Sequence, residues 1–204
     1  GGMCSTCHGV GVDDNGSECA GCGGLGVGPV AAGSRVGGRS WRDCMRTPSG
    51  ELRAFIEAYG ARGGVPEAAR WSLAAARGAL EAMDALGLGA LPLGLAARHV
   101  AVGDRLRLRL AGLMASGLTG VLFAVDEPER GLQSGDIHRV VQGLKRLRDQ
   151  GNSVVVIEHN LDVAKSADWI IDLGPEGGDG GGDVVAVGTP EDVAKNPESY
   201  TGQF

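Results

Sequence analysis

Two runs of hydrophobic residues without alternation stand out in the second half of the chain. Residues Gly120 to Pro128 read GVLFAVDEP and residues Val154 to Asn160 read VVVIEHN, so each apolar run ends in polar residues. Four to six consecutive apolar residues are typical of a strand buried on both faces of a parallel sheet. We therefore expect strands at Val121 to Val125 and Val154 to Ile157, each with charged groups at its carboxyl end.

Helical and extended patterns alternate from about residue 100 onward. Helices are predicted over 104–116, 134–149, 161–166 and 190–194, further strands over 169–173 and 184–187, and a Gly-rich loop over 174–182. This alternation is typical of an α/β protein with a parallel sheet. One segment is ambiguous, because RLRLRL at Arg105 to Leu110 has the period of a strand, whereas Leu110, Leu113 and Met114 continue it at helical spacing.

The residues before this region predict a smaller helical segment. Arg35 to Trp41 suits a short hairpin, and Thr47 to Gly50 is a plausible helix start followed by apolar residues at helical spacing. Pro66 opens an Ala-rich helix over Glu67 to Leu86, and Gly87 ends it. We therefore expect three regions: a cysteine module at 1–34, a hairpin and helical region at 35–99, and an α/β region at 100–204.

Composition and charge narrow the classes of protein. With 204 residues, 43% hydrophobic and 22% charged, the chain is typical of globular proteins. The net charge of −6 does not favour nucleic-acid binding, which would need a local basic patch. No apolar run approaches the roughly 18 residues of a membrane span, and no signal-peptide pattern is present. We expect a cytoplasmic protein, and the two glycines before Met3 indicate a fragment.

Four of the five cysteines form two copies of one pattern. CSTCHGVG and CAGCGGLG both read C-x-x-C-x-G-x-G, and 13-DDNG-16 between them is typical of a hairpin tip. Two such knuckles suit a tetrahedral structural Zn²⁺ site, since the glycines allow backbone amides to face the sulfurs. Reduced thiols or disulfides are the alternatives. His8 is interpreted as a surface residue and Cys44 as a small buried hydrophobe. The predicted ligands are Cys4, Cys7, Cys19 and Cys22.

The polar residues at the two strand ends suit phosphoryl-transfer chemistry. Asp126 is placed to hold Mg²⁺, and Glu127 to orient or deprotonate an attacking water. Gly131 would form a tight loop beside them, and His159 could hydrogen-bond a γ-phosphate. Solvated strand-end acids are the alternative interpretation. The sequence holds no G-x-x-x-x-G-K-[ST] loop to bind nucleotide phosphates.

The chain resembles the UvrA family of ABC-type ATPases over nearly its whole length. GVLFAVDEPERGLQSGD is similar to the family's Walker B and D-loop region, and LKRLRDQGNSVVVIEHN to its H-loop strand with the preceding helix. The paired cysteine knuckles, RVGGRSWRD, Leu86 to Leu91, ADWIIDLG and Gly181 to Thr201 resemble other parts of a UvrA ATPase half. The resemblance favours a helix at RLRLRL. It implies the C-terminal part of one ATPase half with its zinc module.

This resemblance also implies a function. Such a chain would act in DNA damage recognition during excision repair, or in the related resistance to DNA-binding drugs. Asp126, Glu127 and His159 would be catalytic residues, whereas Gly103, Asp104 and Gly131 would bind nucleotide. ATP and Mg²⁺ are expected only in a complete or complemented site. The implied partners are DNA, a second ATPase half and a UvrB-like repair protein.

One departure from the family pattern bears on activity. The family carries LSGGE where this chain has VAVGD at Val100 to Asp104, so only one glycine of the pair remains and Asp replaces Glu. We therefore expect no ATP hydrolysis by this chain alone. The alternative is a non-catalytic, degenerate ABC module that binds DNA or a partner protein. The cysteine pattern also resembles the zinc domain of DnaJ-type co-chaperones, but the α/β remainder does not fit that family.

Overall fold

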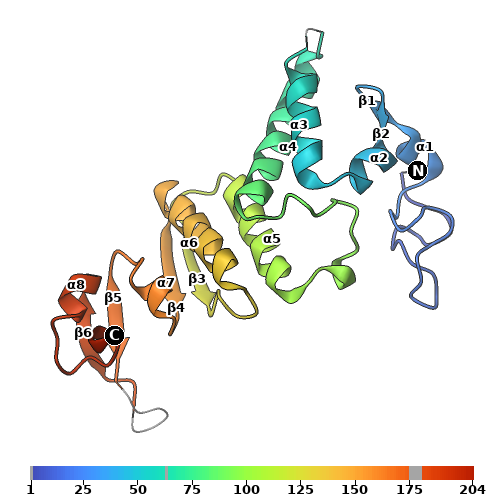
Figure 1. The fold of residues 1–204 in the computed structure, drawn as a ribbon. Helices are drawn as coiled ribbons and strands as arrows, with labels where there is room; N and C mark the ends of the chain where they lie inside the picture. Colours follow the sequence, from blue (N-terminus) through green and yellow to red (C-terminus); the bar gives the residue numbers. More distant parts are fainter. Residues whose placement is uncertain (1, 63, 175–180) are drawn as a thin grey trace. The chain divides into compact units, whose positions relative to one another are not determined.

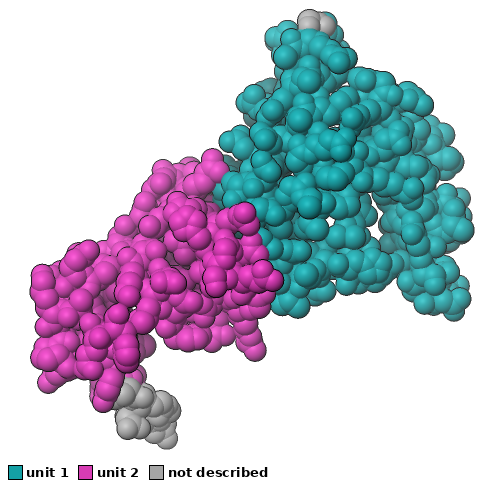
Figure 2. Space-filling model, in the orientation of Figure 1, with its two compact units in different colours: residues 1–118 teal, residues 119–204 magenta. Residues whose placement is uncertain are grey.

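The computed structural model describes residues 2–62, 64–174 and 181–204. It divides into two compact units, Gly1–Leu118 and Thr119–Phe204 (Figure 2). Within the described ranges, no helix is both long and apolar enough to cross a membrane. The part of the expected Gly-rich loop at 175–180 lies outside the described residues.

The first unit begins with the cysteine module, shown in dark blue in Figure 1. Two isolated antiparallel bridges, Met3 with Val27 and Val12 with Glu18, close the two ends of this module. Helix α1 (Pro29–Gly33) follows, and then the predicted hairpin of β1 (Arg35–Val36) and β2 (Arg39–Ser40).

Helix α2 (Trp41–Arg46) starts where the predicted hairpin was expected to end. Its start is fixed by a capping box, in which the Ser40 hydroxyl accepts from the Asp43 amide and the Asp43 carboxylate accepts from the Ser40 amide. These reciprocal bonds satisfy two backbone donors at the first turn, so Trp41 belongs to the helix rather than to the strand. Cys44 is buried in α2, as expected.

Two longer helices form the body of the first unit. Helix α3 (Ser49–Gly60) packs against α4 (Glu67–Ala85). The predicted start of α4 after Pro66 and its end before Gly87 are confirmed. Gly87 has φ +74°, where a residue with a Cβ is strained. The buried residues of this region include Leu52, Leu80, Met83, Leu86 and Leu88.

The RLRLRL segment is helical. A short 3₁₀ turn, η1 (Ala97–His99), leads into α5 (Val102–Ala115), which packs against α4. The buried positions of α5 are Arg107, Leu110, Ala111 and Met114, a spacing of three and four that is typical of one helix face. The first buried position of α5 is an arginine rather than a leucine, and the Arg107 guanidinium donates a hydrogen bond to the Leu86 carbonyl at 3.3 Å.

The second unit begins with a parallel strand–helix–strand motif. Strand β3 (Leu122–Asp126) pairs in parallel with β4 (Ser153–Ile157), and α6 (Ser134–Asp149) connects them. Buried Asn152 fixes the turn before β4, because its side chain accepts from the Val121 amide and donates to the Leu147 carbonyl. The α/β fold class and the parallel pairing are therefore as predicted.

The expectation that these strands are buried on both faces is wrong for the described residues. Exposed and half-buried side chains alternate along β3 and β4. Helix α6 packs against β4, and its buried residues are Val140, Val141, Leu144 and Leu147. No described element of the second unit covers the other face, so Leu122, Val155 and Ile157 remain 64%, 52% and 62% exposed.

The last two strands form a separate antiparallel hairpin. Strand β5 (Ile170–Leu173) pairs with β6 (Val184–Gly188), so these strands do not extend the parallel pair among the described residues. Two one-turn helices, α7 (Leu161–Ala164) and α8 (Pro190–Val193), and the 3₁₀ turn η3 (Thr201–Gln203) complete the unit.

The chain's last residues are tied to β5 by one carboxylate. Asp172 accepts hydrogen bonds from the Ser199 hydroxyl at 2.6 Å and the Thr201 hydroxyl at 2.7 Å. Ser199 is fully buried, and its oxygen also accepts from the Gly202 amide. The C-terminal segment is therefore part of the packed unit.

Candidate functional site

The four clustered cysteines form a buried cage. Their exposed fractions are between 0% and 7%, and one sulfur from each lies within 4.8 Å of the others. The Cys7 and Cys22 sulfurs are 3.7 Å apart. Thiolates at about 2.3 Å from a tetrahedral metal lie about 3.8 Å apart, so this spacing fits one shared ion. Four buried thiols in this arrangement could hold a metal ion, and all five cysteines are free of disulfides.

The two cysteine knuckles make equivalent hydrogen bonds to each other. The Cys4 amide donates to the Gly26 carbonyl, and the Cys19 amide donates to the Gly11 carbonyl. Each second cysteine also receives an amide from its own knuckle, Gly11 to the Cys7 sulfur and Gly26 to the Cys22 sulfur, both at 3.2 Å. The repeated sequence therefore produces a repeated geometry, and the N–H groups face the sulfurs as expected.

The glycines of the two knuckles are required by close backbone contacts. Gly11 and Gly26 have φ of +81° and +70°, and an added Cβ would lie 2.4 Å from the carbonyl oxygen of Gly24 or Gly9, respectively. No real Cβ approaches a backbone oxygen so closely. The C-x-G-x-G spacing thus sets the path of the backbone around the sulfurs.

The environment shifts the pKa values of two thiols in opposite directions. Backbone amides of Cys7 and Thr6 lower the pKa of Cys4 to about 6. Burial raises the pKa of Cys22 to about 11. Near neutral pH the metal-free cage therefore combines the Cys4 thiolate with the neutral Cys22 thiol. A bound cation would remove this difference in protonation by stabilising all four thiolates.

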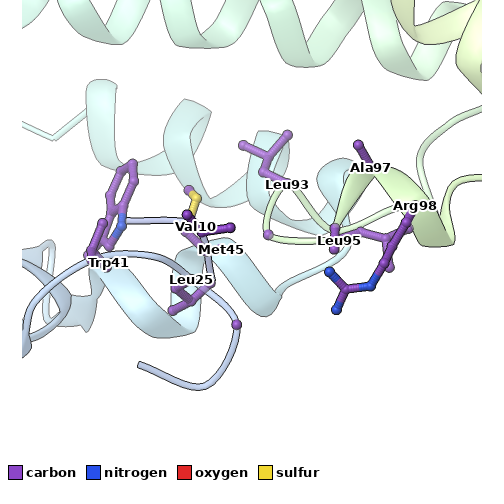
Figure 3. A pocket seen from close by; sticks show the side chains of 12 residues that line it. Val10, Leu25, Trp41, Met45, Leu93, Leu95, Ala97 and Arg98 are labelled. Carbon is purple, nitrogen blue, oxygen red and sulfur yellow. The ribbon is translucent and has the colours of Figure 1, made fainter. Parts of the chain in front are cut away.

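The cage is anchored to α2 by two arginines. Arg42 donates to the Cys22 carbonyl at 3.1 Å, and Arg46 donates to the Gly23 carbonyl at 3.2 Å. Beside these contacts lies an open hollow of about 420 Å³ between the cysteine module, α2 and the segment after α4 (Figure 3). Its labelled lining includes Val10, Leu25, Trp41, Met45 and Leu93.

The second candidate site lies at the carboxyl ends of β3 and β4. Asp126 is in register with Ile157, and the Glu127 amide continues the pairing by donating to the Ile157 carbonyl at 3.0 Å. Parallel strands therefore bring Asp126 and Glu127 to the same edge as Glu158 and His159. Open α/β sheets bind their ligands at this edge.

Glu127 has an unusual backbone conformation at that edge. Its φ of +41° makes it one of two non-glycine residues with positive φ among those described. Left-handed backbone is unfavourable for a residue with a Cβ and clusters at functional sites. The chain then turns tightly, with the Arg130 amide donating to the Glu127 carbonyl and Gly131 at φ +79°. The predicted tight loop at Gly131 is present.

A fourth acidic residue, Glu129, joins Asp126, Glu127 and Glu158 at this edge and was not predicted from the sequence. Glu129 lies 3.5 Å from His159, between Oε1 and Nε2, and its other oxygen accepts a hydrogen bond from the Asn160 amide group. One ligand atom from each of Glu129, Glu158 and His159 lies within 4.8 Å of the others. The sequence signal that could have identified Glu129 is the presence of acidic residues in both loops that follow the paired parallel strands.

Gly103 and Asp104 lie in the first turn of α5 in the first unit. The Asp104 carboxylate accepts a hydrogen bond from the Arg107 guanidinium, one turn further along the helix. In this ion pair the Asp104 carboxylate compensates the charge of Arg107, which is buried and contacts the Leu86 carbonyl. Asp104 therefore stabilises the packing of α5 on α4. The two residues belong to a different compact unit from Asp126, Glu127, Gly131 and His159.

The curated proteins similar to this chain include UvrABC system protein A from several bacteria. The chain is 39% identical to UvrABC system protein A of Lactiplantibacillus plantarum over 213 aligned positions, which cover 100% of this chain and 21% of that protein. It is 53% identical to UvrABC system protein A of Aquifex aeolicus over 131 residues, 64% of this chain and 14% of the relative. No protein-family model matches.

A solved structure supports the same relationship. The crystal structure of UvrA2 from Deinococcus radiodurans has a TM-score of 0.76 and 32% sequence identity, covering 92% of this chain and 24% of that protein. This chain thus spans a quarter or less of the length of these relatives. The shared sequence, the fold and the paired cysteine knuckles lead to one conclusion: the chain belongs to the UvrA family.

Proposed function

We propose that this chain supplies the hydrolytic edge of a UvrA-like ATPase that acts in DNA damage recognition during excision repair. The observation that carries the proposal is the parallel β3–β4 edge, where Glu127 is held in left-handed backbone beside the Ile157 carbonyl. A strained acidic residue at the ligand-binding end of a parallel sheet suits a catalytic role.

Each strand-end residue has a proposed task. Asp126 would hold Mg²⁺ through water, Glu127 would orient or deprotonate the attacking water, and His159 would hydrogen-bond the γ-phosphate. Gly131 would keep the loop close to the nucleotide. Gly103 and Asp104 at the first turn of α5 would contact the γ-phosphate bound by an opposite ATPase half, because helix N-termini favour anions.

The cysteine cage is proposed as a structural Zn²⁺ site. Its donors are four thiol sulfurs, and tetrahedral thiolate sites select zinc over magnesium or calcium. The proposed ligands Cys4, Cys7, Cys19 and Cys22 leave no open coordination position, so the metal would organise the module rather than react. Residues 1–34 are the proposed zinc module, 35–99 the hairpin and helical region and 100–204 the ATPase part.

Hydrolysis is proposed to need a complete site. The chain carries no lysine-bearing phosphate loop, so ATP and Mg²⁺ would bind productively only when another segment or ATPase half supplies it. The same reasoning makes a second ATPase half, DNA and a UvrB-like repair protein the proposed partners of the whole protein.

A chimera tests the catalytic assignment. This chain would replace the matching segment of UvrABC system protein A from Lactiplantibacillus plantarum, and ATP turnover would be measured with and without Glu127→Gln. We expect turnover by the chimera and a loss of at least about 100-fold in the variant, with ATP binding retained. Equal turnover by both chimeras would refute the role of Glu127. The isolated chain serves as the control and should not hydrolyse ATP.

The second candidate function is a non-catalytic module that binds DNA or a partner protein. The observation that favours it is VAVGD in place of LSGGE at the start of α5, where Asp104 pairs with Arg107. Fluorescence anisotropy with damaged and intact duplexes at several salt concentrations separates the two functions. Salt-dependent binding by a chain whose chimera shows no ATP turnover would favour the binding module.

A further inference from the structure

A cluster of two carboxylates and one imidazole lies at the β3–β4 edge beyond Asp126 and Glu127. The Glu158 Oε2 atom lies 3.5 Å from His159 Nδ1, and the Glu129 Oε1 atom lies 3.5 Å from His159 Nε2. The three side chains come from the loops after β3 and β4, so the parallel pairing of the strands brings them together.

Glu158 is the unusual member of this cluster. Its side chain is only 5% exposed, and its Oε1 atom is buried without a hydrogen-bond partner among the described residues. The other oxygen, Oε2, accepts from the His159 amide at 3.0 Å. A buried carboxylate with an unpaired oxygen is costly unless a cation compensates its charge. Among the described residues, the His159 imidazole therefore faces only Oε2 of Glu158, and Oε1 has no partner.

Glu129 is held in position to share such a cation. Its side chain is 16% exposed, and Asn160 donates to Oε2, which leaves Oε1 directed at the imidazole. Two carboxylates supply a charge of −2, which matches a divalent ion. A protonated His159 could bridge both acids, but it would leave the buried Oε1 atom of Glu158 unpaired.

We propose that Glu129, Glu158 and His159 bind a first-row divalent transition cation, Mn²⁺ or Zn²⁺. Oxygen ligands suit manganese, and an imidazole with carboxylates suits zinc. One ion would bind a single ring nitrogen of His159. One ligand atom from each of the three side chains lies within 4.8 Å of the others, so small side-chain rotations would bring them to the roughly 3.4 Å spacing of ligands around a tetrahedral ion. His159 is 76% exposed, so water can complete the coordination shell.

This site differs from the proposed zinc cage and from the proposed magnesium position at Asp126. It uses oxygen and nitrogen donors, whereas the cage uses four sulfurs. It also requires no nucleotide, because all three ligands are present in this chain. Its test can therefore succeed or fail independently of the ATPase assignment.

Electron paramagnetic resonance with Mn²⁺ tests the proposal. The chain is first loaded with one equivalent of Zn²⁺ to fill the cysteine cage, and Mn²⁺ is then titrated without nucleotide. We expect one further Mn²⁺ per chain, displaced by excess Zn²⁺ because zinc binds nitrogen and oxygen sites more tightly than manganese. Glu129→Gln and Glu158→Gln should each weaken Mn²⁺ binding at least about tenfold.

One control variant makes the result specific. Glu191→Gln removes an exposed carboxylate of α8 in the same unit. It should bind Mn²⁺ as the unmodified chain does. Circular dichroism checks folding, and the more exposed Glu129 keeps the test valid if Glu158→Gln unfolds. Absence of Mn²⁺ binding, or unchanged binding by folded Glu129→Gln, would overturn the proposal. An equal loss in Glu191→Gln would also overturn it.

Discussion

The Gly11 amide donates a hydrogen bond to the Cys7 sulfur at 3.2 Å, and a Cβ added to Gly11 would clash with the Gly24 carbonyl oxygen. We therefore predict that Gly11→Ala breaks the cysteine cage. The added Cβ at 2.4 Å must displace the opposite knuckle, so the bound zinc per chain should fall from about one toward zero. Metal analysis after dialysis against a weak chelator measures this loss.

Gly16→Ala is the matched control for this substitution. Gly16 also has positive φ, +76°, but an added Cβ would meet nothing within 4 Å. It should retain zinc, with only the backbone strain of a non-glycine residue in left-handed conformation. Equal zinc loss in both variants would show that backbone strain, rather than the contact between knuckles, controls the cage.

The C-terminal segment should depend on Ser199. Replacing the buried Ser199 with alanine removes the bond to Asp172 and takes the acceptor from the half-buried Gly202 amide. We expect local destabilisation of about 1–3 kcal/mol, because a hydrogen bond to a carboxylate is lost. Hydrogen exchange of the β6 amides should accelerate accordingly. Ser166→Ala removes a half-buried hydroxyl that donates to the Asp162 carbonyl one turn earlier, and it should leave β6 exchange unchanged. Unchanged β6 exchange in Ser199→Ala would contradict the prediction.

The start of α8 gives a pH-dependent prediction. Hydrogen bonds from Thr189 hold the pKa of Asp192 below its ordinary value. The folded-state pKa is lowered, so the stabilisation is complete above the ordinary aspartate pKa and is lost as pH falls through the folded value. Thr189→Val should raise the pKa of Asp192 toward normal, as measured by carboxyl-carbon NMR titration. An unchanged pKa of Asp192 would assign the shift to the Thr189 backbone amide or to Lys195 instead.

The two faces of the parallel strand pair should respond differently to truncation. Leu144 on α6 is 6% exposed, whereas Leu122 on β3 is 64% exposed. We expect Leu144→Ala to cost about 2–5 kcal/mol of unfolding free energy and Leu122→Ala less than about 1 kcal/mol. Urea denaturation of both variants measures the difference. Similar costs would mean that the outer face is covered in solution.

Much of the secondary structure was predictable because local signals agree with the packing. Pro66 and Gly87 delimit α4, and the apolar spacing of α6 matches its buried face. The alternation in RLRLRL misleads, because Arg107 is buried through its contacts with Asp104 and Leu86. The hydrophobic periodicity of a sequence treats every arginine as exposed. The antiparallel pairing of β5 with β6 depends on long-range contacts that the strand patterns do not encode.

The candidate sites were predictable to different degrees. The cysteine spacing indicated the cage, and the two strand ends indicated the polar edge at Asp126 and His159. Glu129 was missed because its position relative to His159 depends on the turn after Pro128. Its sequence neighbours carry no sign of that contact. Burial of the Glu158 side chain was also hidden, since EHN at a strand end reads as solvated residues.

The uncovered face of β3 and β4 affects how Asp126 variants must be interpreted. Its outward row holds Leu122, Ala124 and Asp126 on β3 and Ser153, Val155 and Ile157 on β4, so Asp126 is the only charged side chain in it. A charge at the end of an apolar strand opposes aggregation between copies. Neutralising Asp126 therefore removes a gatekeeper as well as a proposed magnesium ligand, and its loss of activity should be normalised to the monomeric fraction.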